Sequence, residues 1–197
     1  MTKNDQVSPK SFKKYFIKIL KQRKKLYKQL SYLLRKRNLN IAMAESCTGG
    51  LLASRIVSLS GSSLVFWGSV VCYGRDAKIS LLNINERTLN TKGEVSAECA
   101  LEMAQTIKRK ANVSCAISVT GYAQKKMSEK PYAYAACLWE DHKYILFISH
   151  IRGSRNKVRG LLADVLVAFF IFLLLYTVPQ SALSFKMPRF ELKLLTY

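Results

Sequence analysis

The sequence predicts an α/β fold with a five-stranded sheet that is mostly parallel and contains one reversed strand. Short apolar segments alternate with helical patterns over residues 40–119, which is typical of parallel βαβ units. Two later segments, 131–139 and 143–151, flank the pair Glu140-Asp141 and predict a hairpin. The 197 residues are 49% apolar, enough for one well-buried domain with extensions and too apolar for a disordered chain.

The N-terminal region predicts a basic amphipathic helix. Residues 1–38 hold 13 Lys and Arg against the single acid Asp5, so they carry +12 of the formal net charge of +20. Ser8-Pro9 has the residue types of a helix start, and apolar residues recur every three or four positions from Phe12 to Leu33. This arm either packs on the domain through its C-terminal half or contacts an anionic membrane surface or nucleic acid.

The remaining elements follow from apolar patterns and from the turn residues between them. Strands are predicted at residues 40–44, 68–73, 113–119, 131–139 and 143–151. Helices are predicted at residues 51–58, 76–82, 85–89, 96–110 and 154–176. Ser96 is the expected N-cap of the helix that follows it.

The apolar segment near the C-terminus is compatible with two different environments. Residues 161–178 contain one charge, Asp164, and reach the lower limit of length for a membrane span. The segment is expected either to be buried in the protein or in a dimer, or to be inserted in a membrane. Residues 179–197 are expected to form a loosely held tail.

Cysteine and histidine usage argues against a metal or disulfide framework. The five cysteines are odd in number and contain no CxxC pair, which is typical of buried free thiols in a reducing cytosol. His142 and His150 have no metal-like spacing to cysteines or carboxylates, so no metal site is predicted. No secretory signal is apparent, and the expected location is cytoplasmic.

Three predicted parallel strands end in a similar way. Ser46, Tyr73 and Thr120 lie at these ends and are followed closely by Gly49-Gly50, Gly74 and Gly121. The carboxyl ends of parallel strands meet at one edge of a sheet, where ligands bind. Free N–H groups of the next helix, near Thr48, would hold an oxyanion, as acyl transfer requires. The alternative is that Ser46 and Thr48 only cap that helix.

A serine nucleophile needs a base, and Lys78 is the best candidate. It lies five residues after Tyr73, among apolar neighbours on a short helix, and Arg75 adds a nearby positive charge. Burial and neighbouring cations favour the neutral amine, which can accept a proton. His142 and His150 are poorly placed in the sequence for this role. The alternative is that Lys78 is an ordinary surface lysine.

The segment AESCTGGLLA at residues 44–53 resembles the signature of the CinA C-terminal domain family. Further segments resemble that family's motifs in the same order: Gly61-Ser62-Ser63, Val70 to Tyr73 with Asp76-Ala77-Lys78, Gly93 to Ser96, Val119-Thr120-Gly121, Lys130-Pro131, Gly153-Ser154-Arg155 and Val158-Arg159. The resemblance covers roughly residues 28–176.

The resemblance implies a three-layer α/β/α fold with a mixed sheet. It also implies hydrolysis of the carboxamide of nicotinamide mononucleotide to the nicotinic acid nucleotide and ammonia, without a metal or cofactor. By the same resemblance, Ser46 is expected to be the nucleophile, Lys78 the base and Tyr73 an assisting residue. The substrate and its oxyanion would then be bound by Thr48, Gly49, Gly50, Thr120, Gly121 and Arg155.

The sequence departs from the family pattern around the expected substrate loop. The family's T-G-I-A-G-P-x-G-G is replaced by residues 120–127, TGYAQKKM, and its G-D-R aspartate is Ser154. Lys125 and Lys126, or Arg155, would meet the substrate phosphate. The alternative function is a catalytically weakened binding module whose arm contacts nucleic acid, a membrane or a protein partner.

The resemblance also sets the expected organisation. Residues 1–27 form the arm, 28–178 the amidase-like domain and 179–197 the tail. The N-terminal domain of larger family members, linked to nucleotide pyrophosphatase activity, is expected to be absent. A homodimer is expected because the last helix is so apolar.

Overall fold

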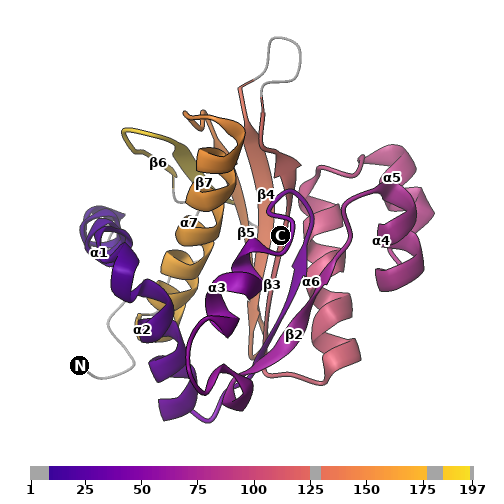
Figure 1. Ribbon diagram of the computed structural model, residues 1–197. Helices are drawn as coiled ribbons and strands as arrows, with labels where there is room; N and C mark the ends of the chain where they lie inside the picture. The colour runs from indigo at the N-terminus through magenta and orange to yellow at the C-terminus, as the bar shows by residue number, and fades with distance from the viewer. Residues whose placement is uncertain (1–8, 125–129, 177–183, 196–197) are drawn as a thin grey trace.

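The computed structural model describes residues 9–124, 130–176 and 184–195 (Figure 1). Its strands are β1 (Ile41–Glu45), β2 (Phe66–Val71), β3 (Cys115–Tyr122), β4 (Tyr132–Trp139), β5 (His142–Ser149), β6 (Ser184–Lys186) and β7 (Glu191–Leu195). Its helices are α1 (Pro9–Lys21), α2 (Arg23–Lys36), α3 (Leu51–Val57), the 3₁₀ turn η1 (Ser62–Leu64), α4 (Arg75–Leu82), α5 (Glu86–Thr91), α6 (Ala97–Ala111) and α7 (Arg155–Leu175).

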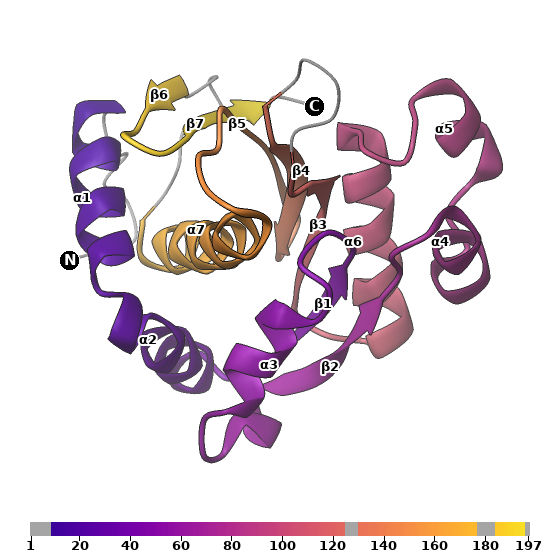
Figure 2. The same ribbon diagram turned by 45° about the horizontal axis from the view of Figure 1, so that its top comes forward.

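The strands form one mixed sheet in the order β2-β1-β3-β4-β5-β7-β6. The prediction of a mixed α/β sheet with helices on both faces is confirmed (Figure 2). The predicted strand count and parallel majority were wrong, because the described residues form seven strands, of which only the pairs β1–β2 and β1–β3 are parallel. The hairpin β4–β5 and the strands of the C-terminal segment extend the sheet with antiparallel pairings.

Alternation along the strands directs different side chains to the two faces. On one face β1 and β3 present small residues, Ala42, Ala44 and Ala116, to α6. Since these side chains are short and α6 supplies Ala100 and Ala104, the helix packs closely on the sheet. Ser96 caps α6 by accepting a hydrogen bond from the Cys99 amide at 3.1 Å, as the sequence predicted.

The opposite face is covered by α7, which is itself enclosed by α1 and α2 (Figure 2). Larger side chains of β1 and β3 face this layer, among them Ile41, Met43 and Ile117. α7 is long and apolar enough to cross a membrane, with a mean hydropathy of 2.4 over 18 residues, but 89% of that window is buried inside the structure. The burial favours the protein-interior alternative that the sequence left open.

The basic arm is part of this enclosure. A single helix was expected for the arm, but the structure has two, α1 and α2, with a break at Gln22. Packing is not restricted to the C-terminal half of the arm, because Phe12 and Phe16 in α1 are at most 1% exposed. The predicted start at Ser8 lies outside the described residues, whereas Pro9 is the first residue of α1.

The C-terminal segment was expected to be a loose tail, and this was wrong for its described part. β7 pairs with β5 from Ile145↔Leu195 to Ser149↔Glu191, and β6 pairs with β7. Leu192 and Leu194 are buried against the core. Alternation of apolar and polar residues over ELKLL therefore reflects a half-buried strand.

Candidate active site

Ser46 lies directly after β1, at the carboxyl edge where β1 neighbours both β2 and β3. Its amide donates to the carbonyl of Val119 in β3 at 3.0 Å, and its carbonyl accepts from the Gly49 amide at 3.0 Å. Gly49 and Gly50 have φ values of 59° and 85°, in the left-handed region that favours glycine. The two glycines therefore permit the tight turn that leads from Ser46 into α3.

Lys78 is buried beside Ser46, not exposed on the surface. Its side chain is 1% exposed, and Nζ lies 3.2 Å from Ser46 Oγ. Nζ also donates to the carbonyls of Cys72 and Tyr73, each at 3.2 Å. The parallel pairing of β1 with β2 brings these two segments together, because Glu45 is in register with Val71.

A carboxylate not singled out in the sequence lies near the lysine. Glu94 Oε2 is 3.7 Å from Lys78 Nζ, and the Glu94 side chain is 40% exposed. Thr120 is fully buried, and its hydroxyl donates to the Glu94 carbonyl at 2.7 Å. Thr120 therefore holds the loop that carries Glu94 in place, and its expected role in substrate binding stays a prediction.

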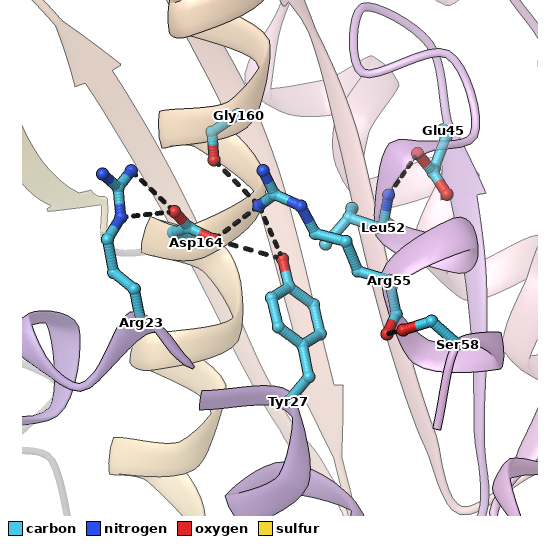
Figure 3. Close-up of polar contacts among 8 residues, drawn as sticks. All are labelled: Arg23, Tyr27, Glu45, Leu52, Arg55, Ser58, Gly160 and Asp164. Carbon is cyan, nitrogen blue, oxygen red and sulfur yellow. Dashed lines mark hydrogen bonds and ion pairs between the residues drawn. The ribbon is translucent and has the colours of Figure 1, made fainter. Parts of the chain in front are cut away.

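Glu45 organises the turn from the protein interior (Figure 3). Its carboxylate accepts hydrogen bonds from the amides of Leu52 at 3.1 Å and Ala53 at 2.9 Å, and from the Ser69 hydroxyl at 3.2 Å. The first two satisfy free N–H groups at the start of α3 and place negative charge at its positive end. A cap seven residues upstream matches no local capping pattern, so this role of Glu45 could not be predicted from the sequence.

The two oxygen atoms of Thr48 differ in their hydrogen bonding. The Thr48 carbonyl accepts two hydrogen bonds from the Arg159 guanidinium, at 2.6 and 3.2 Å. Thr48 Oγ1 is buried and has no hydrogen-bond partner among the described residues. An unsatisfied buried hydroxyl is costly unless something else bonds to it, so this atom is a candidate contact for a ligand.

Tyr73 and Arg155 form a pair at the rim of the site. The Arg155 guanidinium donates to the Tyr73 hydroxyl at 2.7 Å, and the Tyr73 side chain is 59% exposed. Tyr73 touches Lys78 through its backbone carbonyl. The expected assisting tyrosine therefore contributes a main-chain acceptor to the lysine and a hydroxyl to Arg155.

Gly121 allows β3 to pack closely against β4. A Cβ at this position would lie 2.6 Å from both Ala133 Cβ and the Tyr132 carbonyl oxygen. The residue is thus required where β3 and β4 approach each other. The lysines Lys125 and Lys126, expected near a substrate phosphate, lie outside the described residues.

The neighbouring thiol is unsuited to act as the nucleophile in place of Ser46. Burial raises the pKa of Cys47 to about 12, which leaves the thiol protonated at neutral pH. Within the described residues there is no cluster of three or more histidine, cysteine or acidic side chains that could hold a metal ion.

The CinA C-terminal domain family matches residues 23–171. The chain belongs to this family. A CinA-like protein from Fervidobacterium nodosum is 43% identical over 149 residues, which cover 74% of this chain and 36% of that relative. A competence-damage inducible protein from Halothermothrix orenii is 39% identical over 137 residues, which cover 68% of this chain and 33% of that relative. The chain therefore spans about a third of the length of these CinA relatives.

Solved CinA structures share the fold. The competence/damage inducible protein CihA from Agrobacterium tumefaciens is 28% identical, with a TM-score of 0.72 over 77% of this chain and 94% of that chain. A CinA superfamily protein from Klebsiella pneumoniae has the same TM-score at 24% identity, over 76% of this chain and 96% of that chain, and supports the fold alone.

Proposed function

We propose that this CinA-family chain is an amidohydrolase that hydrolyses the carboxamide of nicotinamide mononucleotide to the carboxylate and ammonia. The observation that carries the proposal is the buried contact of 3.2 Å between Lys78 Nζ and Ser46 Oγ. The nature of the substrate follows from the family resemblance, whereas the reaction type follows from this pair of side chains.

The two carbonyls around Lys78 give its amine a defined orientation. A neutral amine has two protons and one lone pair. Lys78 Nζ lies 3.2 Å from Ser46 Oγ and from each of the two carbonyls, so a neutral amine that donates both protons to the carbonyls presents its lone pair to Ser46 Oγ. The hydroxyl proton of Ser46 then transfers to Lys78 as Oγ attacks the carboxamide carbon.

The remaining steps use the same groups in reverse. The C–O bond to Ser46 forms while the carbonyl becomes an oxyanion, for which the backbone amides of Thr48 and Gly50 and the Thr48 hydroxyl are candidate donors. The ammonium of Lys78 returns its proton to the leaving nitrogen, the C–N bond breaks and ammonia departs. Water, deprotonated by Lys78, then attacks the acyl-enzyme and releases the carboxylate and Ser46.

Purified protein incubated with nicotinamide mononucleotide tests this proposal through the ammonia it releases. Ser46→Ala and Lys78→Met are each expected to lower the rate by about 100-fold or more, because each removes a member of the nucleophile–base pair. Ser80→Ala is the matched control, since Ser80 is an exposed serine on the helix that carries Lys78.

The control variant is expected to retain wild-type activity. Hydrolysis that persists in Ser46→Ala would remove the proposed nucleophile. Absence of hydrolysis in the folded wild-type protein, with other nicotinamide nucleotides also inert, would favour the catalytically weakened binding module.

A further inference from the structure

A basic groove lies away from Ser46 and Lys78, between elements distant in the sequence. Its volume is about 660 Å³, and α2, α3, α7 and the segment between β6 and β7 contribute its lining. Ser46, Lys78 and Tyr73 are not among its lining residues. Five of the lining side chains are cationic and one is acidic, namely Arg23, Lys28, Arg55, Lys157 and Arg189 with Asp164.

The acidic residue orders two of these cations (Figure 3). Asp164 is 5% exposed on α7 and pairs with Arg23 at 2.6 Å and with Arg55 at 2.5 Å. Arg55 Nη1 also contacts the Tyr27 hydroxyl and the Gly160 carbonyl, each at 3.1 Å. Its hydrogen bonds to described residues all use Nη1, so Nε and Nη2 remain available as donors within a fixed guanidinium.

The other three cations have no counter-charge in the described structure. Lys28, Lys157 and Arg189 are exposed, and their side chains make no hydrogen bond or ion pair with described residues. Three like charges facing one groove repel each other unless an anion lies between them. Since Asp164 is already shared by two arginines, the groove has an excess of positive charge.

The size of the groove favours a small ligand. Pockets of roughly 300–1,000 Å³ hold metabolites and cofactors, and this groove lies within that range. A chain of linked phosphates presents several negative charges over a short length and suits both the arginine fork and point-charge lysines. We propose that this groove binds a small molecule that carries a phosphate chain.

Calorimetric titration of the whole chain with inorganic tripolyphosphate tests this site. The triple variant Lys28→Gln, Lys157→Gln, Arg189→Gln is expected to weaken binding by about tenfold or more, because it removes three unpaired charges from the groove. The side chains are exposed, so the variant should fold, and its thermal unfolding is measured alongside.

The matched control is the triple variant Lys36→Gln, Arg87→Gln, Lys143→Gln. It removes the same number of exposed charges outside the groove. This control is expected to change binding by less than about twofold, since only the general field of the protein is altered. Equal weakening in both variants, or absence of binding in the wild-type protein at low salt, would overturn the proposal.

A single-stranded oligonucleotide is titrated in parallel. Binding of the oligonucleotide through Lys28, Lys157 and Arg189, with none of tripolyphosphate, would also overturn the proposal and indicate a nucleic-acid surface. Neither titration depends on amide hydrolysis, so the result is independent of the function proposed for Ser46 and Lys78.

Discussion

Lys78 illustrates how position in the fold gives a common residue an uncommon environment. Most lysines of this chain are exposed, whereas Lys78 is 1% exposed and is surrounded by two carbonyls and a hydroxyl. A buried amine needs such acceptors, because burial without hydrogen bonds is costly. The same acceptors orient it toward Ser46.

Glu94 lies close enough to Lys78 to affect its reactivity. Its carboxylate forms an ion pair with Lys78 Nζ at 3.7 Å, and an ammonium held in that pair has no lone pair with which to accept the proton of Ser46. We expect Glu94→Gln to raise the initial rate of amide hydrolysis at neutral pH by roughly twofold, since a part-exposed ion pair contributes only about 0.5 kcal/mol.

Glu98→Gln is the control for this measurement, because the Glu98 carboxylate pairs with Lys92 at 3.2 Å. Its rate should stay at the wild-type value. A rate that falls in Glu94→Gln would mean that the carboxylate assists the reaction.

At the scale of single elements, the β3–β4 pairing depends on one glycine. Gly121 stands opposite Ala133, and an added Cβ would lie 2.6 Å from the Ala133 Cβ. We expect Gly121→Ala to lower the free energy of unfolding by about 2 kcal/mol, because the rigid ladder has little room to separate. Urea denaturation followed by circular dichroism measures the change.

Gly74 offers a matched comparison within the same fold. A Cβ at Gly74 would meet nothing within 4 Å, and its φ of −89° is accessible to alanine. Gly74→Ala should therefore change the free energy of unfolding by less than about 0.5 kcal/mol. Equal stability of the two variants would contradict the structural role assigned to Gly121.

At the scale of the whole molecule, α1 completes the core around α7. The Phe12 ring packs against Phe172 with centroids 4.4 Å apart, and against Phe16 at 5.8 Å. We expect Phe12→Ala to cost about 3 kcal/mol, the usual effect of removing a buried aromatic ring. Lys13→Ala, at the exposed next position, should cost less than about 0.5 kcal/mol.

Thermal and urea unfolding of both variants measure this difference. A Phe12→Ala protein as stable as wild type would mean that the arm is separable from the domain.

Because α1 covers α7, removing residues 1–25 would expose the apolar helix. Substitution of exposed lysines is therefore the cleaner way to test any role of the arm in binding.

The positions of many helices and strands could be predicted, because apolar spacing and capping residues within one segment indicate them. The apolar segment before Ser46, the capped start at Ser96 and the long apolar run after Arg155 each became an element near the predicted position. The pairing partners of the strands were harder to predict from the sequence. The C-terminal strand β7, for example, pairs with β5 although α7 separates the two in the chain.

The family, the alternation of elements and the candidate pair of Ser46 and Lys78 could all be inferred from the sequence, because they depend on residue types at short spacing. The burial of Lys78, the contact of Glu94 with Thr120 beside it and the place of α7 inside the protein became known from the three-dimensional arrangement of the chain. Contacts between segments that are distant along the chain produce no repeating residue pattern in the sequence, because the sheet order and the packing of helices bring those segments together.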